Sequence, residues 1–493
     1  MNGFINMSAM SVRSLEPQVI WNHFEDLNAV PRPSKKEERV RQFMVDFGNK
    51  LGLETIVDKI GNVIIKKPAT AGMENRQTVI LQGHIDMVHQ KNNDTVFDFN
   101  TQGIQSYIDG DWVKAKGTTL GADNGMGVAA AMSLLSSTTI EHPALEALFT
   151  IDEETGMTGA KHLDGSLLSG TILLNLDTED DDEFSVGCAG GIDTNTSYKY
   201  ETQDVPADYT SFQITLKGLK GGHSGMDIHL GRANANLVMN RVIFEATESF
   251  YIRICELEGG SLRNAIPRES VGIVALPTSE KDKFISFFND FTATIKQEYL
   301  ITEPDMIFEL EPIQNTEKML TTADHKKIVS VIYTTPNAVW KMSEKIDGLV
   351  ETSSSLAKVI IKHGEFNTKS LQRSMIDSGR KDIANALKLT YELIEADVVQ
   401  GGEYPGWEPN PDSKILKVLQ AKYVEMYNEK PKVQACHAGL ECGILSEHIP
   451  NCDMISFGPT IRNPHSPDEK VNIQSVQKFW DFLLAVIKDT PVK

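Results

Sequence analysis

The chain has 493 residues, which is long for one ordinary domain, so we expect two or three domains. With 40% hydrophobic and 24% charged residues it has the composition of a globular protein. Its formal charge of −20 argues against nucleic acid and against an anionic membrane as partners, because both bind basic surfaces.

The chain also lacks the sequence features of a membrane or secreted protein. No apolar stretch approaches the length needed to span a bilayer, and residues 1–19 have no apolar core of the kind found in signal peptides. The five cysteines include no C-x-x-C pair, which favours a reducing compartment over a disulfide framework. We therefore expect a cytoplasmic protein.

The first part of the chain alternates predicted helices and strands. Helical spacing of apolar residues predicts helices at 16–29 and 36–51, with Ser34 as the N-cap of the second. Further along, short apolar runs predict strands at 61–66, 77–83, 145–151 and 170–176, and composition predicts a helix at 127–135. This alternation indicates an α/β sheet with helices on both faces. In open sheets of this class, ligands bind at the carboxyl ends of the strands.

From about residue 192 the pattern changes to α+β. Predicted strands and helices alternate over residues 209–219, 231–247, 270–278 and 280–299, and a similar rhythm at 327–395 suggests a duplicated unit. A Gly/Pro-rich turn is expected at 401–411, followed by a helix at 412–428 and a strand at 453–457. We predict a catalytic α/β domain made of residues 1–191 and 398–493, with an inserted α+β lid domain at 192–397.

Polar side chains follow several of the predicted strands. The segments are VILQGHIDMV with His84 and Asp86, LGADNGMG with Asp123, LFTIDEETG with Glu153 and Glu154, ILLNLDTED with Asp177, and FGPTIRNPHSPDE with His465. Each alone is weak evidence, because a lone histidine after a strand is more often structural and acidic pairs are usually solvated. The acidic run at 179–183 is expected to be such a solvated surface. Two histidines and several carboxylates recur at the ends of successive predicted strands, and this recurrence favours a metal site over isolated structural residues. Mixed histidine and carboxylate donors suit Zn²⁺, Co²⁺ or Mn²⁺.

These motifs together resemble the M20 metallopeptidase family. H-x-D, G-x-D-N-G, D-E-E-x-G, the strand-end aspartate and the late histidine are similar to those of the clan that includes aminoacylase and bacterial carboxypeptidases. The segments GGHSGMDIHLGRANAN, ETSSSLA, LQRS and HAGLECG resemble in particular the aminoacyl-histidine dipeptidases, also called peptidase D or cytosolic non-specific dipeptidases. The resemblance covers nearly the whole chain and implies a two-metal, aminopeptidase-like catalytic domain with a lid.

The resemblance also implies a role for each matching residue. Asp123 would bridge two divalent metal ions, expected to be zinc, with cobalt or manganese as alternatives. The other ligands would be His84 and Asp177 at one metal, and Glu154 and His465 at the other. Glu153 would be the general base, and Asp86 would orient His84. The implied substrate-binding residues are His223, Asn264, Arg373 and Gly439.

Elementary chemistry is compatible with this mechanism. Two cations that share a carboxylate lower the pKa of a bridging water, and a glutamate can take its proton and return it to the leaving amine. His223 is the candidate to stabilise the oxyanion, and Arg373 offers a planar fork for the free carboxylate of a dipeptide. The expected activity is metal-dependent hydrolysis of dipeptides of the Xaa-His type, such as β-alanyl-histidine, with broad specificity.

Several alternatives stay open at this point. Without the resemblance, GGHSG is more easily explained as a tight turn whose histidine caps a helix. The neighbouring Cys436, His437 and Cys442 fit no zinc-binding spacing and are interpreted as buried thiols near a glycine turn. The enzyme could instead be a tripeptidase, an N-acyl amino-acid deacylase or a carboxypeptidase of the same clan, or a non-catalytic metal- or peptide-binding protein. The sequence leaves both a monomer and a homodimer open; the expected partners are small peptide substrates.

Overall fold

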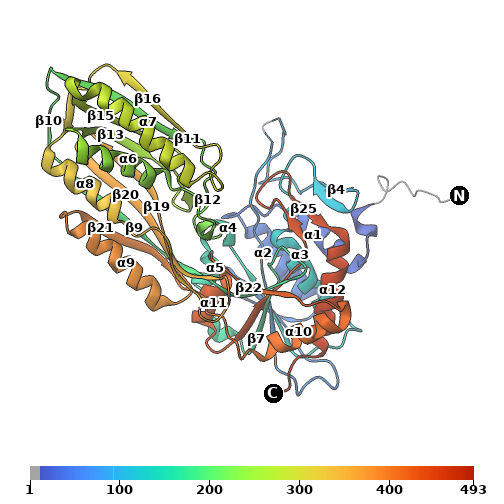
Figure 1. Ribbon diagram of the computed structural model, residues 1–493. Coiled ribbons are helices and arrows are strands. Elements are labelled where there is room, and N and C mark those ends of the chain that lie inside the picture. The colour runs from blue at the N-terminus through green and yellow to red at the C-terminus, as the bar shows by residue number, and fades with distance from the viewer. Residues whose placement is uncertain (1–10, 93) are drawn as a thin grey trace. The chain divides into compact units, whose positions relative to one another are not determined.

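The structure is a computed structural model that describes residues 11–92 and 94–493 (Figure 1). The expectation of no signal peptide is drawn from residues 1–19. Residues 1–10 of that segment lie outside the described residues. The chain forms two compact units. Of the described residues, unit 1 comprises 11–92, 94–187, 409–435 and 440–493, and unit 2 comprises 188–408 and 436–439.

Unit 1 is built on an eight-stranded mixed sheet. Its strand order is β1 (Glu54–Val57), β2 (Val63–Lys67), β6 (Leu145–Thr150), β3 (Val79–His84), β7 (Ile172–Asn175), β23 (Asp453–Ser456), β8 (Glu183–Cys188) and β22 (Lys432–Cys436). The central strands β6, β3, β7 and β23 are parallel, and they correspond to three of the four early predicted strands and to the predicted strand near the C-terminus. The prediction of an α/β fold is confirmed.

Helices cover both faces of this sheet. The helices of unit 1 are α1 (Gln18–Asn28), α2 (Glu38–Lys50), α3 (Ala122–Ser136), α4 (Glu153–Gly156), α5 (Thr158–Lys161), α10 (Lys414–Tyr427), α11 (Glu441–His448) and α12 (Ile473–Lys488). Consecutive residues of β3 point to opposite faces. Gly83 faces Val128 of α3, whereas the side chain of Gln82 donates a hydrogen bond to Glu441 of α11. A small sheet of β24 (Ile461–Arg462), β25 (Lys470–Asn472), β5 (Trp112–Ala115) and β4 (Ser106–Asp109) completes the unit.

Two local predictions in unit 1 are wrong. Ser34 is not the N-cap of α2, which begins at Glu38; the Ser34 hydroxyl instead donates to Asp86 Oδ2 at 2.8 Å. The acidic run at 179–183 is half-buried and paired with cations, since Asp181 lies 3.1 Å from Lys478 Nζ and Asp182 lies 2.8 Å from Lys432 Nζ. In both cases a partner distant in the sequence determines where the side chain points.

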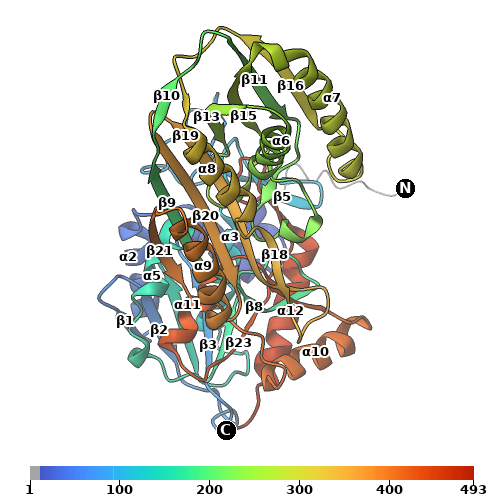
Figure 2. The same ribbon diagram turned by 60° about the vertical axis from the view of Figure 1, so that its left-hand side comes forward.

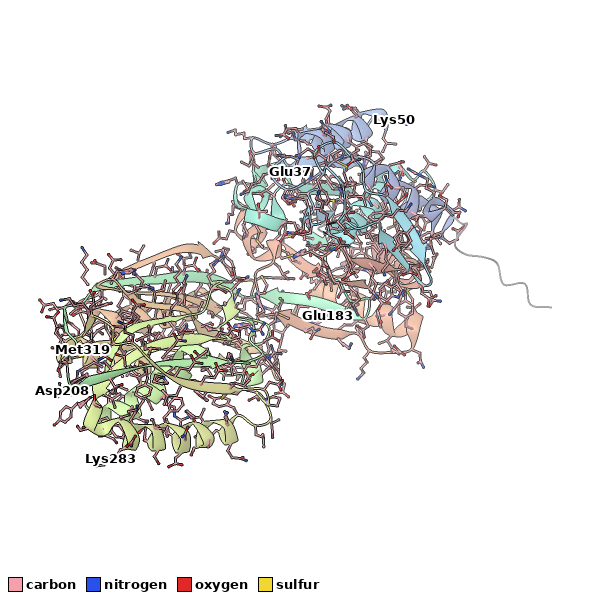
Figure 3. All side chains as sticks on the ribbon, turned by 90° about the horizontal axis from the view of Figure 1, so that it is seen from above. Glu37, Lys50, Glu183, Asp208, Lys283 and Met319 are labelled. Atoms are coloured by element: carbon pink, nitrogen blue, oxygen red, sulfur yellow. The ribbon has the colours of Figure 1, made fainter. Side chains whose placement is uncertain are left out.

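Unit 2 is built on a nine-stranded antiparallel sheet. The order is β16 (Ile307–Ile313), β11 (Tyr209–Lys217), β15 (Ser270–Pro277), β13 (Arg253–Gly259), β19 (Val350–Lys362), β20 (Glu365–Ser374), β9 (Gly190–Lys199) and β21 (Asp397–Tyr404), with β18 (Ala338–Met342) beside β19. Four helices line one face, namely α6 (Ala235–Ser249), α7 (Lys281–Glu298), α8 (Thr322–Thr334) and α9 (Asp377–Glu392) (Figure 2). The apolar core of the unit lies between these helices and the sheet. Figure 3 shows the side chains, with Lys283 marking the first turn of α7.

The sequence predicted some of the strands and helices of unit 2 individually, but not all of them. The predicted strands at 209–219 and 270–278 and the helices at 231–247 and 280–299 correspond to β11, β15, α6 and α7. The two segments of similar rhythm contribute to one continuous sheet. Strand β21 continues to Tyr404, so the predicted turn at 401–411 is wrong for its first residues. Among the described residues, no helix is both long and apolar enough to cross a membrane.

Candidate active site

His84 and Asp86 lie at the carboxyl end of β3, as predicted. His84 is the last residue of the strand, and its Nδ1 lies 3.3 Å from Asp86 Oδ1. Both side chains are almost fully buried. Asp86 also accepts hydrogen bonds from the backbone N–H groups of Glu153 at 3.1 Å and Glu154 at 3.4 Å. Asp86 therefore fixes the orientation of the imidazole and at the same time ties β3 to the turn that carries the two glutamates.

Asp123 lies at the centre of the cluster, where the chain enters α3. Its Oδ1 is 3.1 Å from His84 Nε2, and its Oδ2 is 3.3 Å from His465 Nε2. One carboxylate oxygen thus faces each histidine, which is the arrangement that a bridging ligand between two cations requires. The two histidines lower the pKa of Asp123 despite its burial, so that this carboxylate is ionised.

The remaining donors surround Asp123 in two groups. Asp177 Oδ1 lies 3.6 Å from His84 Nε2, and Glu154 Oε2 lies 3.0 Å from His465 Nε2. Ligand atoms of His84, Asp123 and Asp177 all lie within 4.8 Å of one another, as do those of Asp123, Glu154 and His465. His465 is 54% exposed, so the cluster is accessible from that side. The structure therefore brings together all five residues that the resemblance implies as metal ligands.

Glu153 has a different environment from its neighbour Glu154. The pair begins the short helix α4, directly after Asp152, whose φ of 53° turns the chain sharply at the end of β6. Burial raises the pKa of Glu153 well above its usual value, and the nearby carboxylates of Glu441 and Glu154 add to the shift. Glu153 also reaches within 4.8 Å of ligand atoms of His84 and Glu154. A carboxyl group with a raised pKa beside a cation site can both accept and return a proton.

The donor set fits two divalent cations. Burial raises the pKa of Asp177 well above its usual value, and the neighbouring Asp123 and Glu153 increase the shift, because nearby negative charges disfavour ionisation. Glu154 Oε1 and Asp177 Oδ1 are buried, and neither has a hydrogen-bond partner among the described residues. Buried carboxylate oxygens without partners are costly, and cations within the cluster would satisfy both.

Two further buried charges support this cluster, and sequence reasoning assigned a role to neither. Both carboxylate oxygens of Glu469 accept backbone N–H groups, from Leu120 and Gly121 on one oxygen and from Ala122 and Asp123 on the other. From the other side, the buried guanidinium of Arg32 donates to the carbonyls of Gly121 at 2.6 Å and Asp86 at 2.9 Å. Glu469 lies in the quoted segment FGPTIRNPHSPDE, which is the only signal that marked it.

The second group of predicted residues lies in unit 2, around His223. His223 Nδ1 accepts hydrogen bonds from the backbone N–H groups of Gly225 at 3.2 Å and Met226 at 3.0 Å. A ring nitrogen that accepts carries no proton, so neutral His223 holds its proton on Nε2. Burial and the adjacent Arg373 lower the pKa of His223 to about 4. The side chain is therefore a neutral N–H donor at ordinary pH. Its Nδ1 caps the turn before the short 3-10 helix Ile228–Leu230, as the alternative of a tight turn with a capping histidine describes, and its Nε2–H is left for another partner.

Arg373 is a buried cation without an acidic partner. Its side chain is only 4% exposed, its Nη1 donates to the Tyr404 hydroxyl at 3.0 Å, and its Nη2 lies 3.4 Å from His223 Nε2. Since Nη2 and the protonated Nε2 are both donors, this last contact is not a true hydrogen bond. Arg373 Nε has no partner, and no carboxylate lies within 4.0 Å in the part of the chain that the structure describes. A buried guanidinium of this kind is chemically suited to bind an anion.

The other two predicted substrate residues lie beside this pair. A Cβ atom at Gly439 would lie 2.9 Å from Tyr404 Cε2, so the glycine leaves room for the tyrosine that holds Arg373. The carbonyl of Asn264 accepts a hydrogen bond from Ser224 N at 2.8 Å, which places Asn264 next to the His223 turn, and its side chain is exposed. All four residues therefore surround one part of unit 2.

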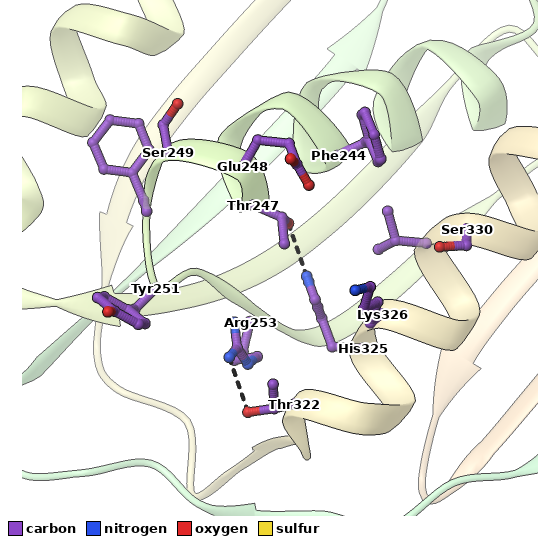
Figure 4. Close-up of a pocket in the computed structure, with 12 residues that line it drawn as sticks. Phe244, Thr247, Glu248, Ser249, Tyr251, Arg253, Thr322, His325, Lys326 and Ser330 are labelled. Atoms are coloured by element: carbon purple, nitrogen blue, oxygen red, sulfur yellow. Dashed lines mark hydrogen bonds between the residues drawn. The ribbon is translucent and has the colours of Figure 1, made fainter.

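Two other histidines of unit 2 have structural contacts. His437 is buried, with Nε2 2.8 Å from the Ser353 hydroxyl, and none of the metal-binding groups found in the described residues includes it, Cys436 or Cys442. Cys442 is buried as predicted, whereas Cys436 is only half-buried. His325 lines a cavity of about 440 Å³ between α6 and α8 (Figure 4). Its Nδ1 accepts from Ile254 N and its Nε2 lies 2.9 Å from the Thr247 hydroxyl, so both nitrogens are satisfied.

The chain is similar in sequence and in structure to known peptidases. The model of peptidase family M20/M25/M40 matches residues 80–489. The cytosol non-specific dipeptidase of Escherichia coli is 41% identical over 99% of this chain and 100% of its own length. The crystal structure of the aminoacylhistidine dipeptidase from Vibrio alginolyticus is 45% identical, with a TM-score of 0.94 over 98% of this chain and 99% of that one. An aminopeptidase of Bacillus cereus, 16% identical with a TM-score of 0.53, shares the fold.

Proposed function

Because the chain belongs to peptidase family M20/M25/M40, we propose that it is a metal-dependent dipeptidase acting on Xaa-His dipeptides, such as β-alanyl-histidine, with broad specificity. The observation that carries this proposal is the full-length similarity to two dipeptidases at 41% and 45% identity. The cluster around Asp123 is consistent with it, because the donor atoms that a two-metal peptidase needs are present in one place.

The metals of this enzyme are proposed to be two zinc ions, with cobalt or manganese as substitutes. His84 and Asp177 would hold one ion, Glu154 and His465 the other, and Asp123 both; the two histidines with three carboxylates form a donor set that suits these metals. When bound, the ions polarise the scissile carbonyl and lower the pKa of the attacking water.

Glu153 is proposed to move the proton of the reaction. It takes a proton from the attacking water as the new carbon–oxygen bond forms, and it returns this proton to the nitrogen as the carbon–nitrogen bond breaks. The products are two amino acids, and Glu153 ends as it began. Its raised pKa supports this role, because the group must be able to hold the proton between the two steps.

Unit 2 is proposed to bind the substrate through His223 and Arg373. The neutral imidazole would donate its Nε2–H to the carbonyl oxygen, where negative charge develops. The guanidinium would bind the free carboxylate of the dipeptide, the anion that Arg373 lacks within the protein. Gly439 and Asn264 would line this part of the site. We also propose a cytoplasmic location, supported by the cysteine pattern and by the name of the E. coli relative.

A substrate panel on metal-stripped and reconstituted enzyme tests this proposal. The panel contains β-alanyl-histidine, other dipeptides, a tripeptide, an N-acyl amino acid and a C-terminally amidated dipeptide, each assayed with Zn²⁺, Co²⁺ and Mn²⁺. Free dipeptides should be hydrolysed at least about tenfold faster than the other classes, a difference of about 1.4 kcal/mol in transition-state binding. Preference for the tripeptide or for the N-acyl amino acid would contradict the assignment.

A further inference from the structure

The His223 loop, residues 220–233, is the segment of unit 2 whose position decides where the Nε2–H points. Its sequence KGGHSGMDIHLGRA is rich in glycine, and Gly221, Gly222 and Gly231 have positive φ values of 64°, 131° and 68°. Glycines at such angles leave the unfolded loop with many conformations to lose. A loop of this composition needs fixed anchors to hold one side chain in one orientation.

Contacts inside the loop fix its shape. Asp227 Oδ2 accepts from His223 N at 2.8 Å and lies 3.3 Å from Arg232 Nη1. Arg232 in turn donates to the carbonyl of Gly221 at 2.6 Å. The short pairing of β12 (Gly222–His223) with β14 (Ala265–Ile266) adds one attachment to the rest of the unit. The Arg232–Gly221 hydrogen bond joins the two sides of the loop close to its ends, and the terminal residues Lys220 and Ala233 are held by a further group.

Glu303 holds both ends of the loop with one carboxylate. The residue lies between α7 and β16 and is only 2% exposed. Its Oε2 accepts from Lys220 N at 2.8 Å, and its Oε1 accepts from Ala233 N at 3.0 Å. Lys220 and Ala233 are the first and last residues of the loop. In the described part of the chain, the hydrogen bonds of the Glu303 carboxylate are those from the two backbone N–H groups, and no ion pair with a lysine or arginine includes it.

This geometry explains why the position carries a carboxylate. Each oxygen receives one N–H, and hydrogen bonds to an ionised acceptor are about twice as strong as neutral ones. An amide at the same position has one acceptor oxygen, and its NH₂ group would face a backbone N–H. A buried charge is costly unless hydrogen bonds compensate it. The Glu303 carboxylate is therefore stable in its buried position only while both loop ends donate to it.

We propose that Glu303 is a positioning residue for the reaction, which clamps the two ends of the His223 loop so that His223 presents its Nε2–H to the bound peptide. This inference rests on the proposed role of His223 as a hydrogen-bond donor. Glu303 itself does not contact the substrate. Its contribution therefore passes through His223 and disappears when the imidazole is absent.

The test combines kinetics with hydrogen exchange on metal-loaded, full-length enzyme. Glu303→Gln should lower kcat for a free dipeptide by about tenfold, the size expected for the loss of one charged hydrogen bond, with KM changed by less than about twofold. In a His223→Ala background the same substitution should have no further effect. Amide exchange in residues 220–233 should become faster. The matched control is Glu309→Gln on β16, whose exposed carboxylate pairs with Lys217, and it should change neither measurement.

Three results would overturn the proposal. An equal loss of kcat in the wild-type and His223→Ala backgrounds would show a general structural effect, and unchanged exchange in the loop would show that the clamp is absent. Glu303→Asp, which keeps the charge but is one methylene shorter, provides a second variant; failure of both variants to fold would mean that Glu303 stabilises the whole unit. If His223→Ala is fully active, the proposed role of His223 fails instead, and the exchange experiment still decides whether Glu303 holds the loop.

Discussion

The two groups of functional residues have opposite charge imbalances. The cluster around Asp123 in unit 1 gathers carboxylates in excess of cations, and it leaves buried oxygens of Glu154 and Asp177 without partners. The cluster around Arg373 in unit 2 has a buried cation, and none of the ion pairs found among residues 11–92 and 94–493 places a carboxylate beside it. Each lacks a charge of the sign that the proposed ligands supply, which are metal cations in one case and a peptide carboxylate in the other.

A second arginine of unit 2 shows what a structural cation looks like. Arg380 is as buried as Arg373, but it lies 2.7 Å from Asp377 and 2.7 Å from Glu403. Its charge is balanced within the protein, so nothing more is needed. A buried charge alone therefore does not indicate a binding site. The indication is a buried charge that has no partner of opposite charge within the described protein.

The largest expected effect separates the two adjacent glutamates of the metal cluster. Glu153→Gln should keep the metal content and lower kcat by roughly 10²-fold or more, because the proton acceptor is lost while the ligands remain. Glu154→Gln should lose metal affinity as well, because it removes a charged donor near His465. Metal analysis and steady-state kinetics on both variants provide the measurement.

The same pair of variants can break this interpretation. Similar metal loss in both variants would show that the two glutamates share the ligand role. A rate near that of the wild type for Glu153→Gln would show that the proton moves through another group. Circular dichroism should be unchanged in both, since neither side chain is needed to form β6 or the parallel centre of the sheet.

A smaller effect is expected in the cationic cluster. Arg373→Ala removes a charge-assisted pair with the substrate carboxylate, worth about 2–5 kcal/mol when well desolvated. We expect kcat/KM for free dipeptides to fall by roughly 30-fold or more, at about 1.4 kcal/mol for each factor of ten. The metal content should not change. The measurement is kcat/KM for matched free and C-terminally amidated dipeptides.

The amidated substrate is the control for this prediction. The wild-type enzyme should hydrolyse it poorly, and Arg373→Ala should reduce that rate much less than the rate for the free dipeptide. Equal losses on both substrates would show that Arg373 supports the structure through Tyr404 and does not bind the carboxylate. The charge imbalance would then have no functional meaning at this position.

The sequence predicted the parts of the molecule that depend on local patterns. Apolar runs located β3, β6, β7 and β23. Polar residues at or just past strand ends located His84, Glu154 and Asp177, and a glycine-flanked aspartate before a predicted helix located Asp123. His465, which lies in a loop between two short strands, was also singled out from the residues, because its loop follows the predicted strand at 453–457; the resemblance was needed to divide the ligands between two metals. Strand ends are predictable because parallel strands bring their carboxyl ends to one edge of the sheet.

What the sequence could not predict depends on long-range contacts. Ser34 has the pattern of an N-cap, yet Asp86 provides a stronger, buried partner for its hydroxyl. Glu469 and Glu303 look like ordinary acidic residues, and only the folded chain shows which backbone N–H groups they accept. Local propensity carries no information about such contacts, because the two partners are far apart in the sequence.

Metal binding to the stripped protein tests the central claim most directly. The chain is depleted with a chelator, verified to be metal-free, and titrated with Zn²⁺ while bound metal and dipeptide hydrolysis are followed together. We predict that the metal-free protein is inactive, that activity returns with added metal, and that binding approaches two ions per chain, with both ions dependent on Asp123. Full activity of verified metal-free protein would contradict the account.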